Sequence, residues 1–210
     1  MHRRIDVAMA VVMAAAAVLT AWATYQGGQW DSDAAAARSN SAILRSDAGR
    51  AAADAVTQSV IDATIWVEWE KAVMLDRGTL AGFLRDRFSP ALDAAQDAWL
   101  GRTAVDADGN PIGGGLPAGT PLALDAYTPP AQLRADELAA RAEDFLARAD
   151  ADSTISSRFV MQAVLLALVL FFGSAATKFG DVRLQAAMAA TAVLMMAVSA
   201  ARLVSLPVLM

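Results

Sequence analysis

Three uncharged, apolar stretches constrain this chain more than any other feature of its sequence. They cover residues 7–24, 159–177 and 184–201, and none of them contains an Asp, Glu, Lys, Arg or His. A helix needs about 20 apolar residues to cross the hydrocarbon core of a bilayer, and about 17 is the lower limit. Each stretch therefore predicts a transmembrane helix, and we extend the third helix past Arg202 to residue 206.

The overall composition excludes several kinds of functional site. Of the 210 residues, 56% are hydrophobic and 19% are charged, compared with about 25% charged in a typical soluble domain. The chain has no cysteine and one histidine, His2, which excludes a disulfide framework, thiolate metal sites and histidine-based catalysis. The net charge of −5 argues against a nucleic-acid-binding surface. We therefore expect no catalytic residue, metal or cofactor, and membrane lipid among the partners.

The first apolar stretch has an alternative interpretation as a cleaved signal peptide. Arg3 and Arg4 resemble its basic start, and residues 21–23 read Ala-Trp-Ala, a possible cleavage site. Against cleavage, the stretch reaches spanning length, and Trp22 and Tyr25 lie where aromatic residues anchor a retained helix. We therefore favour retention of the first span.

The short flanks of the spans predict the topology. The tail at residues 1–6 and the loop at residues 178–183 each contain two basic residues and one acidic residue. Positively charged flanks remain in the cytoplasm, so both should lie inside the cell. The segment at residues 25–158 then lies outside and carries 12 basic and 20 acidic residues, and residues 207–210 form a short tail.

The extracytoplasmic segment reads as helical, and the predicted fold class is all-α. We expect a break at Gly27–Gly28, then one long helix or two nearly continuous ones over residues 32–75, ended by Gly78. Thr79 should cap a short helix to residue 87, and Ser89-Pro90 should begin another to about residue 100. Gly and Pro predict a loop over residues 101–130, followed by a helix that runs close to, or directly into, the second span.

Most candidate site residues are apolar or aromatic. Residues 60–75 are apolar around most of the helix, which predicts burial in a core or a contact with another subunit, with Trp66, Trp69, Ile65 and Val73 as the interaction residues. Internal packing of Trp66 and Trp69 with Trp99 is the competing interpretation. Two further groups are an interfacial aromatic belt (Trp22, Tyr25 and Trp30) and two interhelical amides (Gln162 and Gln185).

Two groups of acidic residues offer weaker patterns. Glu68 and Glu70 lie about 200° apart on a helix and cannot converge, so we expect them and the nearby Asp62 to face solvent. Residues 106–110 read Asp-Ala-Asp-Gly-Asn, but the Gly falls fourth where a calcium loop needs it sixth. The second pattern predicts a plain turn.

The two ends of the chain resemble a known group of proteins. Residues 22–30 read Trp-Ala-Thr-Tyr-Gln-Gly-Gly-Gln-Trp at the exit of the first span, and residues 157–160 read Ser-Arg-Phe-Val at the entry of the second. Together with the short basic loop and a last span, these residues resemble bacterial three-span membrane proteins that contain a domain of unknown function. The resemblance implies a bacterial inner-membrane setting and supplies no activity or site residues.

Three functions fit these observations, and we give them in decreasing order of preference. The first is a non-enzymatic structural, scaffold or accessory subunit, either a homo-oligomer or part of a larger membrane complex. The second is a homo-oligomeric channel, for which Gln162, Thr191 and Ser199 are the available polar residues. The third is an extracytoplasmic sensor that works through a partner, because the cytoplasmic segments are too short to signal by themselves.

Overall fold

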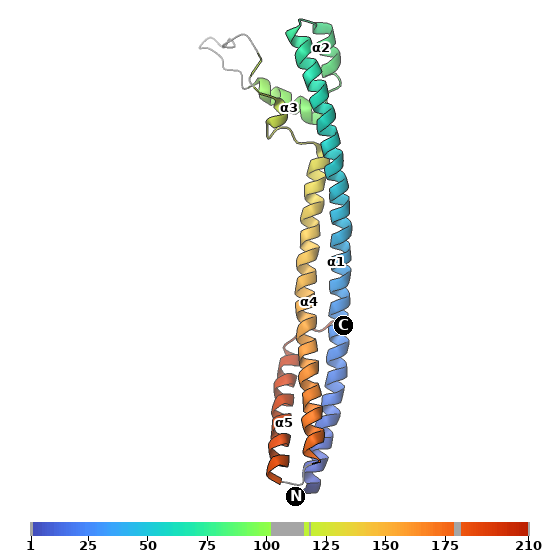
Figure 1. Ribbon diagram of the computed structural model, residues 1–210, viewed down its shortest axis with the longest axis vertical. Coiled ribbons are helices and arrows are strands. Elements are labelled where there is room, and N and C mark those ends of the chain that lie inside the picture. Colours follow the sequence, from blue (N-terminus) through green and yellow to red (C-terminus); the bar gives the residue numbers. More distant parts are fainter. Residues whose placement is uncertain (1, 102–115, 118, 179–181, 210) are drawn as a thin grey trace, which may run out of the picture. The chain divides into compact units, whose positions relative to one another are not determined.

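The computed structural model describes residues 2–101, 116–117, 119–178 and 182–209. Within these residues every regular element is a helix, which confirms the all-α fold class (Figure 1). The elements in chain order are α1 (His2–Met74), α2 (Gly78–Arg85), α3 (Pro90–Leu100), the 3₁₀ turn η1 (Pro121–Ala123), α4 (Pro130–Ala176) and α5 (Val182–Val204). The plain turn predicted at residues 106–110 lies outside the described residues.

Helix α1 is continuous through the glycines at which we predicted a break or a weak point. Gly27, Gly28 and Gly49 all lie inside it. Glycine costs a helix interior about 1 kcal/mol relative to alanine, which alone does not break a long helix. At Gly27 the missing side chain is also needed, since a Cβ there would lie 3.3 Å from the Cβ of Phe159 on α4. The predicted break was wrong because Gly27 is a packing position.

The end of α1 also differs from the prediction that Gly78 stops it. The helix ends at Met74, and Asp76 adopts the left-handed conformation with φ of 55°. The N–H of Arg77 then donates to the carbonyl of Ala72 at 2.8 Å, which closes the helix end as in a Schellman motif. Gly78 instead begins α2.

The two short helices start in different ways. The N-cap of α2 is Arg77, which makes no side-chain capping bond, so the predicted cap by Thr79 was wrong. The N-cap of α3 is Ser89, as predicted, and its hydroxyl accepts a hydrogen bond from the N–H of Leu92 at 3.1 Å. Pro90 occupies the first turn, where its missing N–H costs no helical bond.

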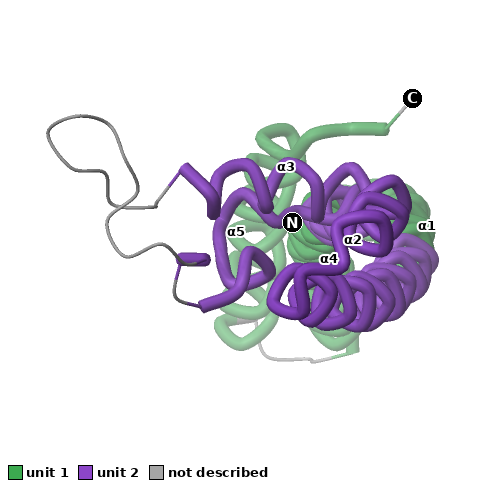
Figure 2. The backbone as a smooth tube through the Cα atoms, turned by 90° about the horizontal axis from the view of Figure 1, so that it is seen from above, with its two compact units in different colours: residues 1–41, 143–210 green, residues 42–142 purple. Residues whose placement is uncertain are grey.

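The chain divides into two compact units, coloured separately in Figure 2. Unit 1 contains residues 1–41 and 143–210, and unit 2 contains residues 42–142. Helices α1 and α4 each contribute a stretch to both units, as predicted for a helix that continues into the second span.

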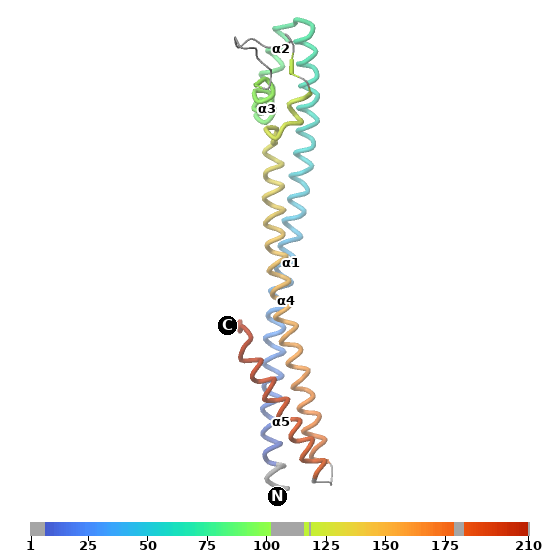
Figure 3. Tube along the Cα trace, turned by 90° about the vertical axis from the view of Figure 1, so that its left-hand side faces the viewer, coloured from blue at the N-terminus to red at the C-terminus, as the bar shows by residue number. Residues whose placement is uncertain are grey.

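Unit 1 is a bundle of α1, α4 and α5 that packs through small side chains. Figure 3 shows α5 running beside the other two helices. A Cβ at Gly173 would lie 2.9 Å from the Cγ of Met13, so this glycine permits close approach of α1 and α4. The buried apolar residues include four from α4 and α5 with large or branched side chains, and alanines on each of α1 and α5: Phe159, Leu166, Val169, Leu203, Ala16, Ala23 and Ala192.

Along the three predicted spans the outer surface of unit 1 is mainly apolar, as a lipid-facing surface requires. Three helices are long and apolar enough to cross a membrane, and they contain the three predicted spans. Large apolar side chains are exposed on each of them, for example Val18 on α1, Phe171 on α4 and Leu194 on α5. Exposed apolar surface of this extent is unfavourable in water and favourable in lipid. The chain is therefore built as a multi-pass membrane protein.

Candidate functional site

Unit 2 has an aromatic core around three tryptophans. The rings of Trp66 and Trp69 on α1 lie 4.8 Å apart between centroids, and Trp99 on α3 meets Trp66 edge to face at 5.0 Å. Leu92 is fully buried beside them, and Phe88 contacts both α1 indoles. The three indoles thus join α1 to α3 and form the hydrophobic centre of the unit.

The four predicted interaction residues are not equally accessible. Trp66 and Trp69 are 3% and 7% exposed, which matches the competing interpretation of internal packing. Ile65 is half-buried, whereas Val73 is exposed at the end of α1. An indole inside the core of its own unit does not reach a partner, so any partner of folded unit 2 must use other residues.

Asp62 is fully buried, so the expectation that it faces solvent was wrong. Its carboxylate accepts hydrogen bonds from Gln58 Nε2 at 2.9 Å, Ser89 Oγ at 2.7 Å and Tyr127 Oη at 2.9 Å. Buried carboxylates are costly unless such donors compensate the lost hydration. The network therefore joins α1 to the cap of α3 and to the segment that precedes α4.

The residues around Asp62 determine whether its carboxylate has a structural or a metal-binding role. Burial raises the pKa of the Tyr127 hydroxyl above its ordinary value of 10.0, and Asp62 raises this pKa further, while a hydrogen bond with Ser59 acts in the opposite direction. Tyr127 thus stays protonated and donates. Among the described residues no three His, Asp or Glu side chains gather as a metal site would require. The arrangement fits a structural clamp between segments.

The position of Asp62 carried a signal that the sequence analysis missed. It lies four residues before Trp66 and seven before Trp69, so all three share one face of α1. By contrast, Glu68 is exposed and pairs with Lys71 at 2.8 Å, as expected of a solvated position. Helical spacing to the tryptophans thus separates the buried carboxylate from the exposed one.

In unit 1, Gln26 and the predicted belt residue Trp30 bind residues 205–209, which we call the strap. The side-chain amide of Gln26 donates to the carbonyl of Leu209 and accepts from its N–H, both at 3.1 Å. Trp30 Nε1 donates to the carbonyl of Pro207 at 3.3 Å. Two residues one helical turn apart on α1 thus bind the backbone of the non-helical strap.

The other belt residues have different surroundings. Trp22 is half-buried and packs edge to face on Phe159, with ring centroids 5.8 Å apart, whereas Tyr25 is exposed. Nearby, the hydroxyl of Ser156 on α4 donates to the carbonyl of Gly27 at 2.9 Å. Non-helical backbone needs hydrogen-bond partners near or within a membrane, and the Gln26 and Trp30 side chains supply them to the strap.

The predicted interhelical amides are both buried in unit 1. Gln162 on α4 is 4% exposed and Gln185 on α5 is 5% exposed. The Oε1 atom of Gln162 and the fully buried hydroxyl of Ser199 have no hydrogen-bond partner. These three polar side chains therefore point into the bundle, away from its outer surface.

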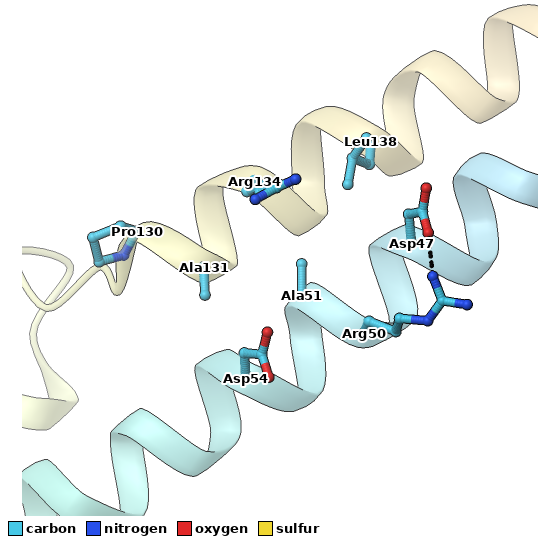
Figure 4. Close-up of a pocket in the computed structure, with 8 residues that line it drawn as sticks. All are labelled: Asp47, Arg50, Ala51, Asp54, Pro130, Ala131, Arg134 and Leu138. Carbon is cyan, nitrogen blue, oxygen red and sulfur yellow. Dashed lines mark hydrogen bonds and ion pairs between the residues drawn. The ribbon is translucent and has the colours of Figure 1, made fainter.

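Among the described residues each unit contains a groove. In unit 1, a groove of about 570 Å³ has an entirely apolar lining: Val18, Leu19, Trp22, Ala200, Leu203, Val204 and Val208. In unit 2, a groove of about 510 Å³ separates α1 from the start of α4, and Figure 4 shows Asp54 and Arg134 among its lining residues. Asp47 and Arg50 form an exposed ion pair at its edge, 2.5 Å apart. Since these charged side chains are mostly exposed, the second groove fits a solvated ionic surface.

Comparison with known proteins gives no match. The sequence matches no protein-family model, no curated protein and no solved structure. The function must therefore be argued from the residues themselves.

Proposed function

We propose that this chain is a non-enzymatic membrane protein that acts as a structural, scaffold or accessory subunit through unit 2. The observation that carries this proposal is that the chemically distinctive side chains of unit 2 are used for internal packing. Its tryptophans and its buried carboxylate hold helices together, while Val56, Val60 and Val67 on α1 remain 63%, 61% and 44% exposed. Exposed apolar side chains gathered on one helix of a water-facing unit are typical of a protein contact.

The alternative function, a homo-oligomeric pore, depends on polar side chains that line a channel. Gln162 and Ser199 are buried inside unit 1, and the Thr191 hydroxyl donates to the carbonyl of Ala187 on its own helix at 3.0 Å. These positions favour a packed membrane anchor over a pore wall.

The setting that we propose is a bacterial inner membrane, with residues 25–158 outside the cytoplasm. The positively charged tail and loop support this orientation. Because the chain has no native cysteine, single cysteines at Asp86 and Lys178 make a clean test. In intact spheroplasts a membrane-impermeant thiol reagent should label the first and not the second, and the reverse pattern would overturn the orientation.

Native mass measurement of the full chain, extracted in a mild detergent, tests the proposed function. A subunit or scaffold should appear as a homo-oligomer or together with other proteins in a defined ratio. A chain that is monomeric and unaccompanied under every extraction condition would overturn the proposal.

A further inference from the structure

The apolar groove of unit 1 is built from three segments that are far apart in the sequence. Three residues of α1 and three of α5 line it, and Val208 of the strap completes the lining. No charged side chain is among these residues. Val18 on α1 and Val204 on α5 remain 70% and 89% exposed. The described part of the chain therefore leaves this groove open to its surroundings.

The position of the groove determines what surrounds it. Its α1 residues lie within the predicted span 7–24 and its α5 residues within the predicted span 184–206, and both helices are long and apolar enough to cross a membrane. Both sets lie near the ends of their spans, on the side that the predicted topology places outside the cytoplasm. The hydrocarbon of the bilayer, rather than water, therefore faces the groove.

The chemistry of the lining favours a hydrocarbon chain as the occupant. A bound water needs about two to four polar partners, and the Trp22 indole is the one lining side chain that contains a polar atom. An empty groove loses the van der Waals contacts of the atoms along its walls. Its volume of about 570 Å³ lies within the usual range of small-molecule sites, about 300–1,000 Å³. Lipid acyl chains are the apolar molecules present at this depth.

We infer that this groove binds an acyl chain of one membrane phospholipid, and that the strap is part of the site. The inference concerns unit 1 and goes beyond the role proposed for unit 2. Gln26 binds the backbone of Leu209 through two hydrogen bonds, which holds the neighbouring Val208 at the groove. The strap, although not helical, thus gains a function as one wall of a lipid site.

The residues beyond the groove on α1 indicate how the lipid lies. Tyr25 is exposed and follows Trp22 by three residues, so it lies almost one helical turn closer to the membrane surface. Aromatic rings at this level accompany lipid headgroups. Val18 lies four residues before Trp22, deeper in the predicted span. The headgroup is therefore expected beside Tyr25, with the acyl chain running past Trp22 toward Val18.

Native mass measurement of the full chain, extracted in a mild detergent and mixed with phosphatidylethanolamine, tests the inference. Ala200→Trp places an indole in the groove and should reduce the retained phospholipid about tenfold, since overpacking costs about 1–3 kcal/mol. Ala201→Trp is the matched control, because Ala201 is exposed and points about 100° away around α5. Equal retention by these two variants would overturn the inference.

The fluorescence of Trp22 supplies a second readout that needs no groove-filling variant. Bromine quenches an indole that it contacts, so phosphatidylethanolamine with brominated acyl chains should quench the wild type more than Trp22→Phe. Trp69→Phe, which removes an indole buried in unit 2, is the control and should keep the quenching. Equal quenching of the wild type and Trp22→Phe would refute the site.

The two proposals fail in different ways. A second copy of the chain that fills the groove would give a doubled native mass without bound phospholipid, and it would overturn this inference while the proposed function stands. A monomeric chain that retains phospholipid, and loses it in Ala200→Trp, would support the lipid site and overturn the proposed function.

Discussion

Units 1 and 2 share the long helices α1 and α4, and unit 2 adds an aromatic and carboxylate core where α1 meets α3. Where α1 meets α4 in unit 1, the buried residues of α1 are mainly alanines, and Gly27 and Gly173 permit close approach. In unit 2, α1 again buries alanines within residues 48–55, and further along it adds Trp66, Trp69 and a carboxylate. One continuous helix thus changes its packing chemistry along its length.

We attribute the difference to the expected surroundings, which are lipid along the predicted spans of unit 1 and water around unit 2. In lipid, burial of apolar surface gives little driving force, so helices associate through close van der Waals contact between small residues. In water, large aromatic side chains gain most from burial, and a small unit needs such residues to form a stable core. The comparison teaches that the side chains at the helix interfaces, rather than the helices themselves, distinguish the two environments.

The largest expected effect is the loss of an indole from unit 2. Trp99→Ala should destabilise this unit by about 3–5 kcal/mol, the usual cost of removing a core tryptophan. Hydrogen exchange should show faster exchange of amides in residues 42–100 and unchanged protection in residues 159–176. Trp22→Ala, which removes the half-buried indole of unit 1, is the control. Equal loss of protection in both units after Trp99→Ala would contradict the independent packing of the two units.

The Asp62 network should be the next most sensitive site. Asp62→Ala leaves the donors of Gln58, Ser89 and Tyr127 without their acceptor, which should cost unit 2 about 3 kcal/mol. Asp62→Asn keeps one carbonyl oxygen and should cost less. Thermal unfolding of both variants checks this order, and an alanine variant as stable as the wild type would refute the clamp.

A smaller effect is expected at the strap in unit 1. Gln26→Ala removes both hydrogen bonds to Leu209 and should cost about 1–2 kcal/mol. Limited proteolysis should then cut the strap faster than in the wild type. Gln29→Ala is the matched control because Gln29 is exposed on the same helix. Similar cleavage in both variants would show that Gln26 does not hold the strap.

The smallest expected effect is a change in the stability of unit 2 with pH. Because the folded pKa of Tyr127 is raised above 10.0, its protonated hydroxyl contributes stability that is fully present below pH 10. This contribution is lost as the pH rises from 10 through the folded pKa. Tyr127→Phe should therefore lose less stability than the wild type between pH 9 and the most alkaline pH accessible. Parallel loss in both proteins would rule out this linkage.

Local sequence signals predicted much of the fold. The apolar stretches predicted three helices that can span a membrane, Ser89-Pro90 predicted the start of α3, and the helix before the second span was expected to continue into it. Each of these features depends on residues that are close together in the chain. The predicted break at Gly27 failed because the role of this glycine is set by Phe159, which is far away in sequence.

The site residues were harder to predict for the same reason. Trp22 and Trp30 were recognised as a group, but the function of Gln26 between them depends on Leu209, which is 183 residues away. The burial of Asp62 depends on Ser89 and Tyr127 from two other segments. A single sequence shows which residues share a helix face, and it does not show which distant segment covers that face.

The bond between Gln26 and Leu209 has a consequence for the order of biosynthesis. Ribosomes add about 5–20 residues per second, so the 183 residues that separate the two take roughly 10–40 s to make. Unit 2 is one uninterrupted segment of residues 42–142 and can mature while translation continues, whereas unit 1 depends on segments from both sides of it. Until the end of that interval the strap is absent, and water or the insertion machinery must supply the hydrogen bonds of Gln26, which lies just beyond the first span.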